Sequence, residues 1–151
     1  MIGGSAVFAS ALTAGSFVPY LDYEGDLAVG GMVGPLTTAG TAQTFSYSLT
    51  GVDPDCDDPS LDFTLEASNS CGIHIHSGTS CLVNALGHYY DVATLSADPW
   101  ASVVYTSGVG IQEVNTGLTA EQVEGKAMII HNKAGARIAC ALLQQQVRPS
   151  Y

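Results

Sequence analysis

Hydrophobic and polar residues alternate along several short stretches of this chain, and clusters of Gly, Pro and Asp separate those stretches. The clearest example is residues 43–49, where Phe45, Tyr47 and Leu49 fall on one face and hydroxyl-bearing residues fall on the other. A period of two is typical of a strand that buries one face. By the same reasoning, further strands are predicted at residues 26–33, 61–67, 72–76, 100–106, 125–131 and 137–143.

Many short strands joined by Gly- and Pro-containing turns indicate an all-β fold, and we expect a Greek-key β-sandwich or barrel of about eight strands. The composition agrees, because 17 glycines and only 12% charged residues are unlike a helical protein with charged outer faces. One short helical turn is predicted at residues 119–123, where Thr119 is a candidate N-cap and Gln122 follows three residues later.

By composition the chain divides into three segments: an apolar N-terminal arm (residues 1–22), the β domain (residues 23–143) and a polar C-terminal tail (residues 144–151). The arm resembles a signal peptide around Ala9-Ser10-Ala11. It lacks a basic start and glycines interrupt it, so we expect it to be an ordered part of the mature chain. Such an arm could donate a strand to a neighbouring copy and support self-association. No stretch reaches the ~18 apolar residues of a membrane span.

The net charge of −10 comes from 14 acidic residues against 4 basic residues. Nucleic acid is therefore not an expected partner, because phosphate binding needs clustered Lys and Arg. The same charge argues against binding to an anionic membrane surface. The acidic turn with Asp53, Asp55, Asp57 and Asp58 lacks the spaced Gly and final Glu of an EF-hand calcium loop, so a solvated turn is the better interpretation.

The four cysteines, Cys56, Cys71, Cys81 and Cys140, form no CxxC pair. Two disulfides formed in an oxidising compartment would explain the even number, so we expect an extracellular or secreted protein. Free buried thiols in a cytosolic protein are the alternative.

Two histidines, His74 and His76, lie two residues apart in a predicted strand. Both imidazoles would project from one face, while the isoleucines beside them point into the core. Two adjacent imidazoles suit a transition metal, although strands also carry such a pair by chance. The chain holds only two other histidines, His88 and His131, and this sparing use favours a shared site.

At these residues the sequence resembles a known family. The segments CGIHIHSGTSC, GHYYD and VEGKAMIIHNKAGARIACALL, all within residues 71–143, are similar in type and order to the copper/zinc superoxide dismutase family. The resemblance implies that one copper ion is bound by His74, His76, His88 and His131. It also implies conversion of superoxide to oxygen and hydrogen peroxide by Cu(II)/Cu(I) cycling.

The resemblance further assigns an anion-binding residue and a disulfide. Arg137 stands three residues before Cys140, the spacing of the family's arginine that lies over the copper and pairs with superoxide. The family's disulfide would join Cys81 to Cys140. A bridge between the remaining Cys56 and Cys71 would fix the acidic turn beside the strand of the two paired histidines.

The sequence departs from the family's pattern at the positions that would bind zinc. No histidine stands between His88 and His131, and only residues 132–136 separate His131 from Arg137, so the zinc ligands and the long charged loop are missing. The chain therefore resembles the copper-only branch, including copper-only repeat domains, and no zinc is expected. Without zinc, Asp91 or Glu113 could accept the second hydrogen bond of His88; for each, a solvated surface acid is the alternative.

The negative net charge opposes an anionic substrate at long range, but salt screens it and local charge dominates. Lys126, Lys133 and Arg137 all lie near His131 in sequence and could attract superoxide. Two other hypotheses remain. The chain could be a non-enzymatic copper-binding module, or a structural subunit of an extracellular assembly that is joined through residues 1–22.

Overall fold

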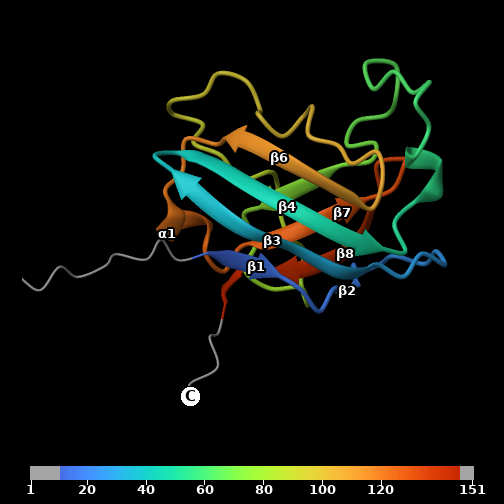
Figure 1. Cartoon of the computed structure of the whole chain (residues 1–151), viewed down its shortest axis with the longest axis horizontal. Coiled ribbons are helices and arrows are strands. Elements are labelled where there is room, and N and C mark those ends of the chain that lie inside the picture. The colour runs from blue at the N-terminus through green and yellow to red at the C-terminus, as the bar shows by residue number, and fades with distance from the viewer. Residues whose placement is uncertain (1–10, 147–151) are drawn as a thin grey trace, which may run out of the picture.

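The computed structural model describes residues 11–146, which form two antiparallel sheets packed face to face (Figure 1). The first sheet has the strand order β6-β4-β3-β1-β9 and the second β2-β8-β7-β5. The elements are β1 Leu12–Ala14, β2 Val18–Pro19, β3 Gly30–Ala39, β4 Ala42–Thr50, a 3-10 turn at Pro54–Cys56, β5 Ile73–His76, β6 Val109–Asn115, α1 Ala120–Val123, β7 Ala127–His131, β8 Arg137–Leu142 and β9 Gln144–Gln145. The predicted all-β sandwich is confirmed.

The core lies between the sheets and follows the alternation in the sequence. In β4, Phe45, Tyr47 and Leu49 are buried, while the residues between them are partly or fully exposed. They pack in one cluster with Ile73 and Ile75 from β5 of the second sheet. Burying one such side chain contributes about 1.5–3 kcal/mol, so this alternating face fixes the orientation of both sheets.

Strand β7 is buried on both faces, unlike β4. Met128 and Ile130 belong to the core between the sheets, whereas Ile129 belongs to a second apolar cluster with Ala85 and Cys140. The loop that follows β5 and contains Ala85 therefore covers the outer face of the second sheet, and it is called the covering loop below. The histidines lie on this covered face.

Several predicted elements agree with the structure to within a few residues. The strands predicted at 43–49, 72–76, 125–131 and 137–143 correspond to β4, β5, β7 and β8. The predicted helical turn is α1: the Thr119 hydroxyl accepts from the Gln122 amide, and the Gln122 side chain accepts from the Thr119 amide. This reciprocal capping box satisfies two amides at the start of the helix.

Two predicted strands are wrong. Residues 61–67 form turns, because the Asp62 carboxylate accepts a hydrogen bond from the Thr64 amide and holds the backbone in a turn. Residues 100–106 also form turns, and only a single bridge joins Val104 to Gly72. Asp98 accepts from the Trp100 amide and starts this segment in a turned conformation.

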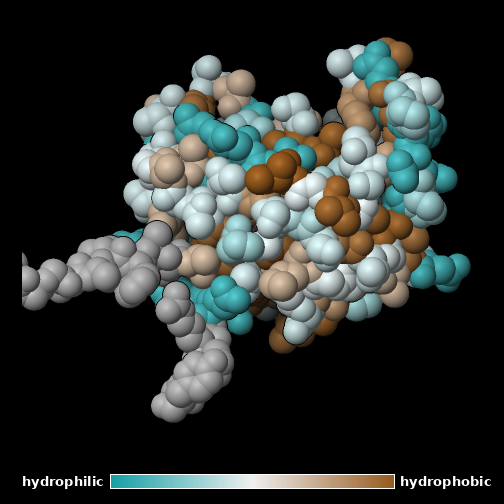
Figure 2. Space-filling view, in the orientation of Figure 1, coloured by the Kyte–Doolittle hydropathy of each residue, from teal (hydrophilic) through white to brown (hydrophobic). Residues whose placement is uncertain are grey.

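Strand β6 was not predicted, and β3 is displaced from the predicted 26–33. The apolar side chains Val109 and Ile111 of β6 are 71% and 70% exposed, so its hydrophobic pattern does not mark its buried face. Figure 2 shows apolar side chains at the surface of the first sheet, which faces the viewer. In β3, the register shifts between Val33 and Leu36, at the position of Pro35, and this irregularity lets a strand pass through a proline.

Both ends of the described chain join the sheets. β1 lies between β3 and β9, so Gln144 and Gln145 of the tail segment pair with β1. β2 pairs with β8, with Val18 opposite Cys140. The candidate cleavage motif at Ala9-Ser10-Ala11 lies outside the described residues except for its last residue, and self-association through residues 1–22 stays a prediction.

Two disulfides brace the loops. Cys56 is bonded to Cys71, directly before β5, and Cys81 is bonded to Cys140 of β8. The second bridge holds the covering loop against the strand that begins with Arg137. Within residues 11–146, no helix has the length and apolar character that crossing a membrane requires.

Candidate metal centre

Two histidines of the site come from β5. Ile73 and Ile75 are buried in the core between the sheets, and His74 and His76 alternate with them and so project from the opposite face. Both imidazoles are nevertheless buried, at 0% and 1% exposure, because loop residues cover this face.

The third histidine, His131, ends the neighbouring strand β7. Its amide donates to the Gly72 carbonyl, and the β5–β7 pairing brings its ring 4.9 Å from the ring of His74, centroid to centroid. Gly72 leaves the space in which these rings meet. A Cβ there would lie 2.4 Å from Cε1 of His74 and 3.0 Å from Cδ2 of His131.

The fourth histidine, His88, comes from the covering loop. A single antiparallel bridge pairs it with His76, and the amide of the next residue, Tyr89, donates to the Ile75 carbonyl. Its ring lies 4.4 Å from that of His74 and 5.0 Å from that of His76. The loop is thus hydrogen-bonded to β5 at the point where it delivers the last imidazole.

One ligand nitrogen from each of the four histidines lies within 4.8 Å of the others. Among residues 11–146, this is the one cluster of three or more potential metal-binding side chains that the structure contains. The structure therefore brings together the four histidines singled out from the sequence.

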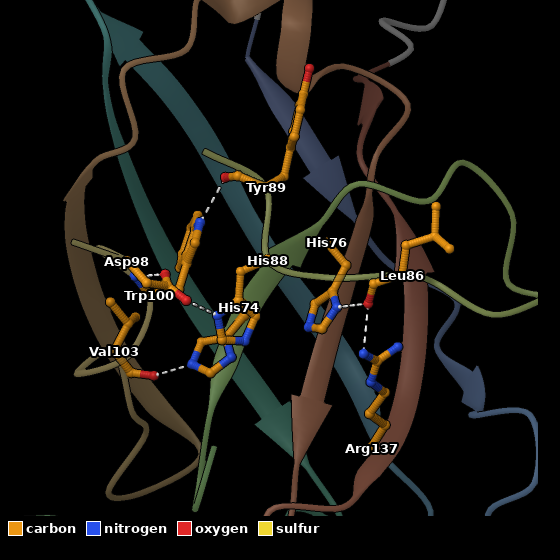
Figure 3. Close-up of polar contacts among 9 residues, drawn as sticks. All are labelled: His74, His76, Leu86, His88, Tyr89, Asp98, Trp100, Val103 and Arg137. Carbon is orange, nitrogen blue, oxygen red and sulfur yellow. Dashed lines mark hydrogen bonds and ion pairs between the residues drawn. The ribbon is translucent and has the colours of Figure 1, made fainter. Parts of the chain in front are cut away.

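Each imidazole is oriented by a hydrogen bond on its outer side, and Figure 3 shows these contacts for His74, His76 and His88. His74 uses Nε2 to contact the Val103 carbonyl at 2.8 Å, and His76 uses Nδ1 to contact the Leu86 carbonyl at 2.8 Å. His131 uses Nδ1 to contact the Gly135 carbonyl at 3.1 Å. Because a carbonyl only accepts, each of these nitrogens carries the proton and the other ring nitrogen has a free lone pair.

The inward-facing nitrogens, His74 Nδ1, His76 Nε2 and His131 Nε2, are buried and have no hydrogen-bond partner. An unpaired buried acceptor costs free energy, so three of them facing one point indicate a missing ligand. Deprotonated imidazole nitrogens with fixed tautomers are what a transition metal requires. The residues present thus fit a metal ion.

Burial keeps these imidazoles neutral. Desolvation, followed by repulsion from His131 and His88, lowers the pKa of His74 from 6.5 to about 2. Desolvation lowers the pKa of His76 to about 3, against the opposing effect of the Leu86 carbonyl. Desolvation likewise lowers the pKa of His131 to about 4. Near neutral pH no proton competes with a metal for the ligand lone pairs.

The hydrogen-bond partner of His88 is Asp98, a residue that sequence reasoning missed. Oδ2 of Asp98 lies 2.6 Å from Nδ1 of His88. Neither acid proposed from the sequence has this role: the Asp91 carboxylate binds Ala93 and Thr94, and Glu113 is exposed on β6. A cleft of about 430 Å³ adjoins both His88 and Asp98 and leaves this side of the site open to solvent.

Arg137 lies beside His76, on the side of the site away from Asp98 (Figure 3). Its Nη2 donates to the Leu86 carbonyl at 2.6 Å, the same carbonyl that orients His76. Its positive charge also contributes to the lowered pKa of both His76 and His131. A fixed guanidinium next to a metal-binding cluster can hold a small anion at the metal.

Comparison with known proteins identifies the fold. No protein-family model and no curated protein matches the chain. The similar solved structures include two of variants of superoxide dismutase 5 from Candida albicans. The first has a TM-score of 0.58 at 16% identity and covers 94% of this chain and 96% of that chain. The second has a TM-score of 0.57 at 15% identity and covers 97% and 96%. The chain has the superoxide dismutase fold.

The superoxide dismutase fold extends beyond the segments that carry the sequence resemblance. Those segments lie within residues 71–143, whereas the structural match covers at least 94% of the chain. At this identity the likeness concerns the fold. The histidine cluster and its surroundings, rather than the likeness, support the choice of metal and reaction.

Proposed function

We propose that this chain is a copper-only superoxide dismutase that acts outside the cell. The observation that carries the proposal is the convergence of three buried, unpaired histidine nitrogens with His88, next to the guanidinium of Arg137. When bound there, one copper ion would supply one-electron chemistry, Cu(II) oxidising one superoxide to oxygen and Cu(I) reducing a second to peroxide.

The ligand set supports copper. Four imidazoles suit both copper oxidation states, and the cluster contains no thiolate or carboxylate. Structural zinc sites are closed tetrahedra, usually with cysteine ligands, and all four cysteines here are held in disulfides.

The residues around the cluster would bind the anion and orient the imidazoles. Arg137 would bind the superoxide anion through a charge-assisted hydrogen bond. Asp98 holds the proton on Nδ1 of His88 and so keeps Nε2 of that ring as the metal ligand. The carbonyls of Val103, Leu86 and Gly135 likewise hold the proton on the outer nitrogen of the other three imidazoles, which leaves Nδ1 of His74 and Nε2 of His76 and His131 as ligands.

Charge near the site opposes the repulsion expected from the net charge of −10. At physiological salt the Debye length is about 8 Å, so an approaching anion responds chiefly to charges close to the cluster. Arg137 donates to the Leu86 carbonyl that also orients His76, so its charge lies close to the cluster. We propose that Arg137, with Lys126 and Lys133, makes the approach favourable.

An extracellular location fits the covalent structure. One disulfide ends at Cys71, two residues before β5, and the other at Cys140 on β8. The glutathione and thioredoxin systems of the cytosol would reduce such bonds. The same covalent framework would serve an extracellular assembly subunit.

The test is a superoxide assay on copper-loaded protein with Arg137→Ala and Arg137→Lys as variants. We expect wild type to catalyse dismutation, Arg137→Ala to be slower by about tenfold at equal copper content, and Arg137→Lys to lie between them. A copper-saturated wild type without activity would contradict the proposal and leave a non-enzymatic copper-binding module. Equal rates for wild type and Arg137→Ala would show that Arg137 takes no part in the reaction.

A further inference from the structure

Tyr20, from the N-terminal part of the described chain, lies against Arg137. It directly follows β2, and its amide donates to the Ile138 carbonyl at 3.0 Å. Because β2 also pairs with β8 at Ala139 and Cys140, the backbone of Tyr20 is fixed beside the strand that begins with Arg137. The tyrosine is therefore placed by the sheet rather than by chance contact of two surface side chains.

The Tyr20 side chain contacts the guanidinium in two ways. Nη1 of Arg137 donates to the Tyr20 hydroxyl at 2.9 Å. The guanidinium carbon also lies 5.4 Å from the centroid of the Tyr20 ring, within the range of a cation–π contact. The ring and the hydroxyl thus act on the same cationic group.

The same hydroxyl fixes the loop that completes the guanidinium's surroundings. It accepts from the Ala85 amide at 3.0 Å and lies 3.5 Å from Oδ1 of Asn84, which in turn accepts from Arg137 at 3.2 Å. One residue later, the Leu86 carbonyl accepts from both Arg137 and His76. A single tyrosine oxygen therefore connects the arginine to the loop that orients a site histidine.

We propose that Tyr20 is a positioning residue for anion binding: it holds the guanidinium of Arg137 beside the histidine cluster in the orientation that receives superoxide. The inference rests on the proposed function. Arginine has many rotamers, and an anion that binds a free guanidinium must also pay for ordering it. A side chain already fixed by Tyr20, Asn84 and Leu86 has lost that freedom before the anion arrives.

The test compares Tyr20→Phe, which keeps the ring and removes the hydroxyl, with Tyr23→Phe as a matched control. The Tyr23 hydroxyl also accepts a backbone amide, that of Leu27, but makes no contact with Arg137. The first readout is the NMR order parameter of the Arg137 Nε–H bond in copper-free protein. The sequence has one other arginine, Arg148, so the two signals are readily assigned. The order parameter should fall in Tyr20→Phe and stay unchanged in Tyr23→Phe.

The second readout is azide affinity of the Cu(II)-loaded protein, followed by its optical spectrum, together with kcat/KM for superoxide. Tyr20→Phe should weaken both by about fivefold to tenfold at unchanged copper content, whereas Tyr23→Phe should not. Tyr20→Phe should add nothing further in an Arg137→Ala background, because the tyrosine acts through that arginine.

An unchanged order parameter and unchanged azide affinity in Tyr20→Phe would overturn the inference. So would an additional loss in the Arg137→Ala background, since that would mean a structural role independent of the arginine. An inactive wild type would overturn the proposed function instead, and the order parameter and azide affinity would still decide the role of Tyr20.

Discussion

Nδ1 of His88 and Oδ2 of Asp98 lie 2.6 Å apart, and this pair orients the one imidazole of the site that is not anchored by a backbone carbonyl. A carboxylate accepts a hydrogen bond from Nδ1–H and raises the basicity of Nε2. His88 stands on a loop rather than on a strand. Its orientation therefore depends on Asp98 more than the strand histidines depend on any single partner.

Replacing this carboxylate should weaken copper binding. Asp98→Asn keeps the size of the side chain and removes its charge, and we expect copper affinity to fall by about tenfold or more, as measured by competition with a chelator. Asp91→Asn is the matched control, because the Asp91 carboxylate binds only its own turn. Equal affinities for Asp98→Asn and wild type would show that the hydrogen bond from His88 to Asp98 does not affect the ligand.

Gly72→Ala should disturb His74 and His131 at once. The new methyl group would lie 2.4 Å from Cε1 of His74, so the ring must shift. Overpacking of this kind costs about 1–3 kcal/mol, measurable by urea unfolding, and copper affinity should fall in parallel. Gly87→Ala, next to His88, should be neutral because no atom lies within 4 Å of its added carbon. Unchanged stability and unchanged copper affinity in Gly72→Ala would mean that the rings of His74 and His131 are arranged differently in solution.

Copper binding should quench the fluorescence of the protein's only tryptophan. Trp100 is buried, and its ring lies 6.0 Å from that of His74. Cu(II) at the cluster is within quenching distance, so titration should give a break at one copper per chain. Zn(II), which has a filled d shell and no redox chemistry, should not quench. A His74→Gln variant that is quenched like wild type would place the copper elsewhere.

The two disulfides should contribute unequally to stability. Cys81 and Cys140 are 59 residues apart and Cys56 and Cys71 are 15 apart. In the chain-entropy model, replacing the long-loop pair with alanines costs about 4 kcal/mol and the short-loop pair about 3 kcal/mol. Urea unfolding of both double variants measures the difference. A larger loss for the short-loop pair would show that native packing, rather than loop entropy, sets the contribution.

Sequence alone predicted the parts of the fold that bury one face. β4 and β5 follow the alternation of apolar residues, and both elements lie where that alternation predicts them. β6 escaped detection because Val109 and Ile111 face solvent. At residues 61–67 the sequence predicted a strand that the structure lacks. The alternating Leu61 and Phe63 belong to turns held by Asp62.

The site shows a similar division. Histidines are rare in this chain, and their spacing marks them, so all four were found from the sequence. Asp98 was not, because it lies ten positions after His88 along an irregular loop and no periodicity relates their side chains. Tyr20 was hidden for the same reason: it lies 117 residues from Arg137, and only the pairing of β2 with β8 brings them together.

The most direct test of the central claim is metal analysis of the purified native protein followed by a superoxide assay on the same sample. We predict one copper ion per chain, no stoichiometric zinc, and dismutation activity that rises in proportion to copper content. Replacing His131 with Gln should abolish both copper retention and activity. Stoichiometric zinc in the cluster, or full copper occupancy without activity, would contradict the account.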